Sequence, residues 1–206
     1  MFRSAPVVLA LAALLLTTSV ASAAVPSPQN STVESCLRVC PAGDIHIRII
    51  VRDLANNPVA GSSVLLDFCS CPFIALCPLQ GGEPYQIVTS CQVSMLTDAA
   101  GVAEFPLRAG GVCIGSVVVY ADGVNLAQRG FVASPDQNGN MTVNASDQAL
   151  LGLKIGGPYD PTGDLNCSGA LEAGDQGVLA GHLGHSCAVV VPTLPKSWGT
   201  VKTIYR

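Results

Sequence analysis

The chain has 206 residues, of which 12% are charged, and a formal net charge of −4. This length is sufficient for one domain with a hydrophobic core and a small additional module. Six acids stand against one base, Lys154, between residues 134 and 187. The acidic excess there favours a cation as ligand and argues against a nucleic-acid partner, which would require a basic face.

Residues 1–23 have the pattern of a secretory signal peptide. Arg3 provides the positive start, residues 7–16 form an apolar run, and residues 21–23 are a small-residue cleavage site. The apolar run is too short to span a membrane, and no later stretch is long and apolar enough to do so. We therefore expect a secreted protein without a membrane span, either extracellular or associated with the cell surface.

The segment that follows predicts mainly β-structure. Residues 24–43 are expected to form an extended, proline-containing lead-in, and residues 69–85, which hold three cysteines, an irregular excursion tied by disulfides. Alternation of apolar and polar residues between turn signals predicts the strands. These lie at residues 45–49, 64–68, 86–95, 102–107, 113–120 and 126–133. We interpret residues 44–133 as an antiparallel β-sandwich.

Three turn motifs in this sandwich are similar to those of bacterial immunoglobulin-like and carboxypeptidase-regulatory-like domains. They lie at residues 51–61, 97–103 and 121–123. Such domains are stalks, spacers and adhesive modules of secreted proteins. The resemblance implies an immunoglobulin-like sandwich, and it implies a fold more than a function.

An internal duplication follows the sandwich almost directly. The segment that begins at Asp136 recurs without a gap from Asp164, 28 residues later. Both copies place oxygen-bearing side chains at loop positions 1, 3, 5 and 12, which is the pattern of a twelve-residue calcium loop. Such a loop directs alternate side chains at one centre, and calcium takes six to eight oxygen ligands.

We expect positions 1, 3, 5, 7, 9 and 12 of each loop to hold one calcium ion, with position 7 acting through its carbonyl and position 9 through water. In the first loop these residues are Asp136, Asn138, Asn140, Thr142, Asn144 and Asp147. In the second loop they are Asp164, Asn166, Ser168, Ala170, Glu172 and Asp175. Position 8 is Val143 or Leu171, each expected to be buried between the paired loops. The alternative is a pair of polar turns that cap two helices without metal.

With a helix after each loop and Asp rather than Glu at position 12, residues 134–187 resemble a type I dockerin. Dockerins are modules that plug into cohesin domains in bacterial extracellular assemblies. The resemblance implies a two-helix, EF-hand-like module that binds two calcium ions and docks on a cohesin-like protein; other copies of this chain are the second partner considered. Met141 replaces the usual glycine at position 6, where positive φ is needed, so we expect a weaker first site.

The two helices are expected to share a small apolar core. Its predicted members are Leu150, Leu151, Leu153, Val178, Leu179 and Leu183. His182 and His185 lie three residues apart and could share a face and bind a metal. Two histidines without a further ligand indicate a surface pair instead, because zinc sites need three or four ligands.

Nine cysteines in a secreted chain predict disulfides. Cys167 and Cys187 are the only two in the duplicated module, and we expect them to pair. Seven cysteines remain, so one is free, or links two chains, or this pairing is wrong. Zinc is the alternative for four of them: Cys36, Cys40, Cys69 and Cys71.

Residues 188–206 form a proline-containing tail, in which Trp198, Val201 and Tyr205 fall at helical spacing. This tail either docks back on the protein or is a terminal recognition tag. We find no signature of a catalytic site and expect a non-catalytic protein that docks or assembles with extracellular partners. The alternatives are a structural subunit of an extracellular layer or appendage, with purely structural calcium, and an accessory component of polysaccharide-degrading machinery.

Overall fold

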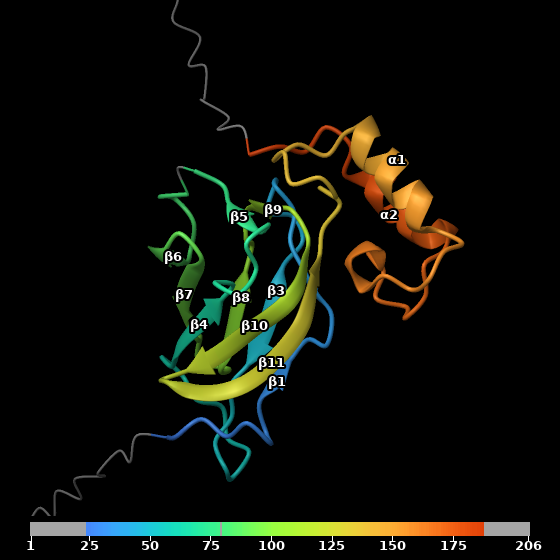
Figure 1. Ribbon diagram of the computed structural model, residues 1–206. Coiled ribbons are helices and arrows are strands. Elements are labelled where there is room, and N and C mark those ends of the chain that lie inside the picture. Colours follow the sequence, from blue (N-terminus) through green and yellow to red (C-terminus); the bar gives the residue numbers. More distant parts are fainter. Residues whose placement is uncertain (1–23, 79, 188–206) are drawn as a thin grey trace, which may run out of the picture.

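The computed structural model describes residues 24–187 except residue 79 (Figure 1). The predicted signal peptide and the C-terminal tail lie outside these residues. The described chain is mainly β-structure with two α-helices, as the sequence predicted at this level. The helices lie beside the β part rather than within it (Figure 1).

Two sheets form most of the β part. The larger contains, in spatial order, β2 (Leu37–Arg38), β11 (Val124–Ala133), β10 (Cys113–Ala121), β4 (Ser63–Asp67), β7 (Gln92–Leu96) and β6 (Gln86–Thr89). The smaller contains β1 (Thr32–Val33), β3 (Ile47–Ile50) and β8 (Val102–Phe105). A separate ribbon pairs β5 (Ala75–Leu76) with β9 (Ala109–Gly110). Neighbouring strands are antiparallel, except that β2 runs parallel to β11.

One hydrophobic core contains residues of both the larger and the smaller sheet. On β3, Ile47 and Ile49 are fully buried while Arg48 between them is exposed. Phe105 on β8 and Val119 on β10 belong to the same buried cluster. This alternation has the period of two residues that a strand imposes, so each strand supplies one apolar face to the core.

The lead-in at residues 24–43 belongs to this fold. It contributes β1 to the smaller sheet and β2 to the larger one. Arg129 on β11 donates hydrogen bonds to the carbonyls of Glu34 (2.7 Å) and Val33 (2.6 Å). These contacts fix the segment between β1 and β2 against the larger sheet.

The single strand predicted at residues 86–95 is wrong. The chain turns back at Ser90, and residues 86–89 pair with residues 92–96 as a hairpin. Ile87 and Val93 are therefore partners across two strands instead of members of one strand. The turn lies next to the Cys69–Cys91 disulfide, which attaches the hairpin to the end of β4. A run of apolar and β-branched residues does not by itself mark such a reversal.

The predicted disulfide between Cys167 and Cys187 is also wrong. The described residues include all nine cysteines, of which eight form Cys36–Cys167, Cys69–Cys91, Cys71–Cys113 and Cys77–Cys187. The Cys187 amide donates to the Met141 carbonyl at 3.1 Å, which places Cys187 beside the first loop instead of the second. The alternative of a zinc site at Cys36, Cys40, Cys69 and Cys71 is wrong, because three of these four cysteines are in disulfides. Disulfides of this number are compatible with an extracellular protein.

Two short helices follow the predicted loops. They are α1 (Ala145–Lys154) and α2 (Ala173–Gly181), with a turn of 3₁₀-helix, η1 (Pro161–Gly163), between them. Leu151 and Leu179 are buried as predicted, and Val178 packs partly against the same cluster. Leu150, Leu153 and Leu183 are instead exposed, by 38%, 82% and 43%. A helix of ten residues packs against its neighbours with one narrow stripe, so Leu150 and Leu153 of α1 face outward, and Leu183 lies beyond the end of α2.

Gly177→Ala is expected to raise the free energy of unfolding by about 0.5–1 kcal/mol, because Gly177 lies within α2 and glycine is a poor helix former. A methyl group there would meet no atom within 4 Å. Gly123→Ala is the matched control, since Gly123 is equally open but has φ of +81°. That substitution should lower stability by about 1–2 kcal/mol. Denaturant unfolding of both variants measures the difference, and equal changes would contradict the expectation.

Candidate functional site

The two predicted calcium loops belong to one helical module. Residues 136–147 lead from β11 into α1, and residues 164–175 lead from η1 into α2. Helices α1 and α2 contact each other side by side (Figure 1). The side-chain amide of Gln176 donates a hydrogen bond to the backbone carbonyl of Gln148 across this contact at 3.3 Å.

Six hydrogen bonds recur at equivalent positions of both loops, with lengths between 2.8 and 3.3 Å. The position 1 carboxylate accepts from the amides of positions 5 and 6, and the position 3 oxygen accepts from position 5. The position 5 oxygen accepts from position 7, and the position 12 carboxylate accepts from positions 3 and 9. Equivalent oxygens are thus held toward the centre of each loop by backbone amides.

The backbone also repeats between the loops. Position 4 has positive φ in both, at Gly139 (70°) and Cys167 (59°), and so does position 6, at Met141 (65°) and Gly169 (82°). The positive φ predicted for Met141 is therefore confirmed. This conformation costs a residue with a side chain about 1–2 kcal/mol, so the first loop is strained relative to a loop with glycine at position 6.

The carboxylates at positions 1 and 12 are buried. Asp136, Asp147 and Asp175 are 0% exposed, and Asp164 is 2% exposed. Among the described residues, no basic side chain forms an ion pair with any of them. The one base of the module, Lys154, is held by Asp160 at 2.9 Å. Buried carboxylates without a counter-charge are costly, and proteins offset that cost by pairing them or by binding a metal.

The first position of loop one shows this cost directly. Burial raises the pKa of Asp136, and the nearby carboxylate of Asp147 raises it further, while the amide of Met141 opposes the change. A divalent cation in the loop would favour the ionised form of both groups. The donors at positions 1, 3, 5 and 12 are all oxygens, which fits a hard cation such as calcium.

The remaining predicted ligands are placed less uniformly. The Thr142 carbonyl accepts from the Asn144 side chain (3.0 Å), and the oxygen of that side chain caps α1 by accepting from the Ser146 amide (2.8 Å). In loop two, the Ala170 carbonyl accepts from Ser168, and Glu172 accepts from Asn166 at 3.4 Å. Position 9 thus acts as a helix cap in the first loop and faces position 3 in the second.

Contacts that the sequence did not predict fix the first loop to the β part. The Gly111 amide donates to Oδ2 of Asp136 at 3.1 Å. A methyl group on the neighbouring Gly110 would collide with the same carboxylate. Val143 is buried as expected, but its backbone pairs with Gly184 and His185 after α2 rather than with the second loop.

The second loop is fixed at three places. Arg38 on β2 donates to the Leu165 carbonyl at 2.7 Å, and Cys36 is bonded to Cys167 at position 4. The hydroxyl of Tyr159 donates to Oδ2 of Asp164 at 2.8 Å. Burial, together with the carboxylate of Asp164, raises the pKa of Tyr159 to about 12. Both loops are therefore attached to the β part by residues distant in sequence.

A pH dependence follows for Asp136 in calcium-free protein. A carboxyl whose pKa is raised on folding contributes stability below its ordinary pKa of about 4, and this contribution is lost as pH rises through the raised value. Thermal unfolding of wild type and Asp136→Asn from acidic to neutral pH measures it. The stability of wild type relative to the variant should increase as pH falls; a difference that stays constant would contradict the assignment. Excess calcium should reverse the trend, because calcium requires the ionised carboxylate.

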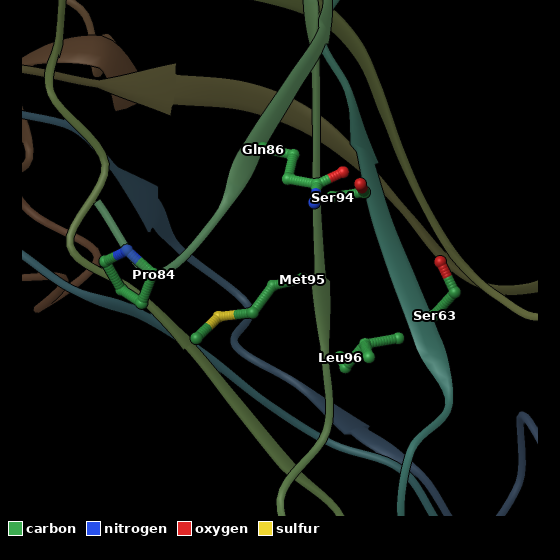
Figure 2. A pocket seen from close by; sticks show the side chains of 6 residues that line it. All are labelled: Ser63, Pro84, Gln86, Ser94, Met95 and Leu96. Carbon is green, nitrogen blue, oxygen red and sulfur yellow. The ribbon is translucent and has the colours of Figure 1, made fainter. Parts of the chain in front are cut away.

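A pocket of about 380 Å³ lies on the larger sheet (Figure 2), at the strands β4, β6 and β7, which are away from the helical module (Figure 1). Its lining residues are Ser63, Pro84, Gln86, Ser94, Met95 and Leu96. Figure 2 shows the polar ends of Gln86 and Ser94 close together and Met95 reaching toward Pro84. This lining has hydroxyl and amide groups but neither an acid nor a base that would activate a serine.

The three histidines of the chain lie in two places. His46 pairs with Glu104 at 2.7 Å on the exposed face of the smaller sheet. His182 and His185 follow α2 and lie together, but they contact the N-terminal segment of the chain, which the sequence did not predict.

No helix among the described residues has the length and apolar character needed to cross a membrane. Comparison with protein-family models, with curated proteins and with solved structures finds no match for this chain.

Proposed function

We propose that this chain is a secreted, non-catalytic calcium-binding protein that docks with extracellular partners through a dockerin-like module at residues 134–187. The observation that carries the proposal is the set of six hydrogen bonds repeated in both loops around buried carboxylates. If each loop holds the same ion, we expect the two loops to share both their sequence pattern and the backbone-amide hydrogen bonds that position their side-chain oxygens. Calcium neutralises the carboxylates and orders both loops.

We propose the β part as an immunoglobulin-like sandwich that carries the calcium module. Its support is the division of the strands into two sheets over one core, with the first segment contributing β1 to one sheet and β2 to the other. The module follows β11 without a linker and is bonded to the β part by two disulfides, Cys36–Cys167 and Cys77–Cys187. The sandwich therefore presents the module in a fixed orientation.

Calorimetric titration of calcium tests the proposal, with thermal unfolding measured in parallel. Wild type should bind two ions, and calcium at about a thousand times the dissociation constant should add about 4 kcal/mol of stability per site. Asp147→Asn should remove the first site and Asp175→Asn the second, because each takes a buried carboxylate from one loop.

Asp53→Asn is the matched control for these variants. It removes one negative charge from an exposed turn outside the module, where the carboxylate of Asp53 accepts hydrogen bonds from the backbone and side-chain amides of Asn57. It should therefore retain both calcium sites. Wild type that binds no calcium, or loop variants that bind it as wild type does, would overturn the proposal.

The docking part has its own test. Leu150 and Leu153 lie three residues apart on α1 and are exposed, which provides an apolar contact surface on that helix. A type I cohesin domain is the first probe, and self-association of this chain is the second. Binding that requires calcium and is lost in Leu153→Glu, but kept in Asp53→Asn, supports docking. If the protein binds calcium but associates neither with cohesin nor with itself, the role of calcium is only structural. The two disulfides that hold the module against the β part favour this alternative.

A further inference from the structure

Four side chains of different chemistry converge where the end of α2 meets the N-terminal segment. They are Cys40, Asp44, His182 and His185, and one donor atom from each lies within 4.8 Å of all the others. Cys40 is fully buried and is the cysteine left over from the disulfides. None of the four is a proposed calcium ligand, so this cluster is distinct from both calcium ligand sets, although the carbonyl of His185 accepts a hydrogen bond from the Val143 amide of the first loop at 2.8 Å.

Two tight turns bring the four residues together. The Gly43 amide donates to the Cys40 carbonyl at 2.9 Å, which returns the chain so that Asp44 lies beside Cys40. The His185 amide donates to the His182 carbonyl at 3.0 Å, which turns the second imidazole toward the first. The Cys77–Cys187 disulfide follows two residues later and holds the second turn against the β part. The cluster is thus assembled by backbone geometry.

The distances between the donor atoms match those around a tetrahedral zinc ion. The sulfur of Cys40 is 3.8 Å from Nδ1 of His182 and 3.7 Å from Nδ1 of His185. The two Nδ1 atoms are 3.2 Å apart and lie 2.9 and 3.3 Å from Oδ2 of Asp44. Zinc bonds of usual length at tetrahedral angles give about 3.6 Å between sulfur and nitrogen and about 3.3 Å between the lighter donors.

Without a metal ion, hydrogen bonds alone satisfy these four donor atoms poorly. If both Nδ1 atoms donate to Oδ2 of Asp44, two N–H groups face each other across 3.2 Å. If one of them lacks its proton, its lone pair faces a carboxylate oxygen instead. A cation at the centre accepts a lone pair from all four donors and removes both conflicts.

We propose that Cys40, Asp44, His182 and His185 form a structural zinc site. One thiolate, two imidazoles and one carboxylate are a donor set that suits zinc, and four protein ligands make the site closed rather than catalytic. The ion joins the N-terminal segment to the end of the helical module. It also explains why Cys40 is a free thiol in a chain that otherwise oxidises its cysteines.

Without a bound metal ion, the thiol of Cys40 is inert. Burial above all, and also the carboxylate of Asp44, raises the pKa of Cys40 to about 12. The thiol is therefore protonated at neutral pH without metal, and zinc binding displaces that proton.

Cobalt(II) titration of the purified protein tests the site, with the four disulfides formed and excess calcium present throughout to occupy the loops. One equivalent should give the near-ultraviolet charge-transfer band of a cobalt thiolate and the visible bands of tetrahedral cobalt, and zinc should displace it. Cys40→Ser should abolish the charge-transfer band. His185→Ala should weaken binding by more than about 100-fold, since loss even of outer-shell partners costs 10–100-fold.

His46→Ala is the matched control, because His46 is an exposed histidine that pairs with Glu104 outside the cluster. It should bind cobalt as wild type does. Since Cys40 is buried, Cys40→Ser could fail to fold; His185→Ala, a half-exposed position, keeps the test decisive, with folding checked by circular dichroism. Absence of a thiolate band in wild type, or equal binding by the His185 and His46 variants, would overturn the proposal. Loss of calcium binding in Asp147→Asn or Asp175→Asn should leave the cobalt spectrum unchanged.

Discussion

Replacing Cys36 and Cys167 together with serine is expected to lower the free energy of unfolding by about 3–5 kcal/mol and to weaken calcium binding in the second loop. The disulfide joins residues 131 positions apart, so its loss restores much chain entropy to the unfolded state. Cys167 is exposed, so the serine leaves no cavity there. Cys167 also holds position 4 of the loop at positive φ, a conformation that the bond to Cys36 helps to maintain.

The Cys69–Cys91 pair provides the matched control. That disulfide spans only 22 positions and lies between β4 and the β6–β7 hairpin. Loop-closure entropy predicts that its removal costs about 1.5 kcal/mol less than removal of Cys36–Cys167. Denaturant unfolding compares the two double variants, and calcium titration compares their sites. Equal losses of stability, or an unchanged second site in the Cys36 and Cys167 variant, would contradict the role given to this disulfide.

Gly110→Ala is expected to abolish or weaken the first calcium site by more than tenfold and to leave the second intact. The added methyl group would occupy the place of the Asp136 carboxylate and approach the sulfur of Met141. Asp136 holds the backbone of its loop through amides of Asn140 and Met141, so moving it disturbs the whole ligand set. Overpacking of this kind typically costs about 1–3 kcal/mol of stability.

Gly130→Ala is the control for this substitution. Gly130 also lies in a strand, β11, but a methyl group there would meet no atom within 4 Å. It should therefore leave both calcium sites unchanged. Calorimetric calcium titration distinguishes the outcomes: one binding event for Gly110→Ala and two for Gly130→Ala. Two events of wild-type affinity in the Gly110 variant would show that Asp136 does not contribute to the first site.

The two loops were predictable because their information is local. Twelve consecutive residues fix which oxygens can meet, and the 28-residue repeat indicated that the pattern occurs twice. The positive φ of Met141 followed from the same spacing. The capping role of Asn144 did not, because position 9 has two hydrogen-bonding options and the start of α1 takes one of them.

The local sequence was enough to predict mainly β-structure, two short helices and the positions of the loop oxygens along the backbone. Alternation of apolar residues and loop spacing act over a few residues, so they can be read without the fold. Packing in three dimensions was needed to show which cysteines pair, which leucines of the helical module stay exposed, and that Cys40 and Asp44 meet His182 and His185. Several of these outcomes, the Cys36–Cys167 and Cys77–Cys187 disulfides and the contact of Cys40 with His182, depend on residues more than a hundred positions apart, and the packing of the helical module against the β part sets them.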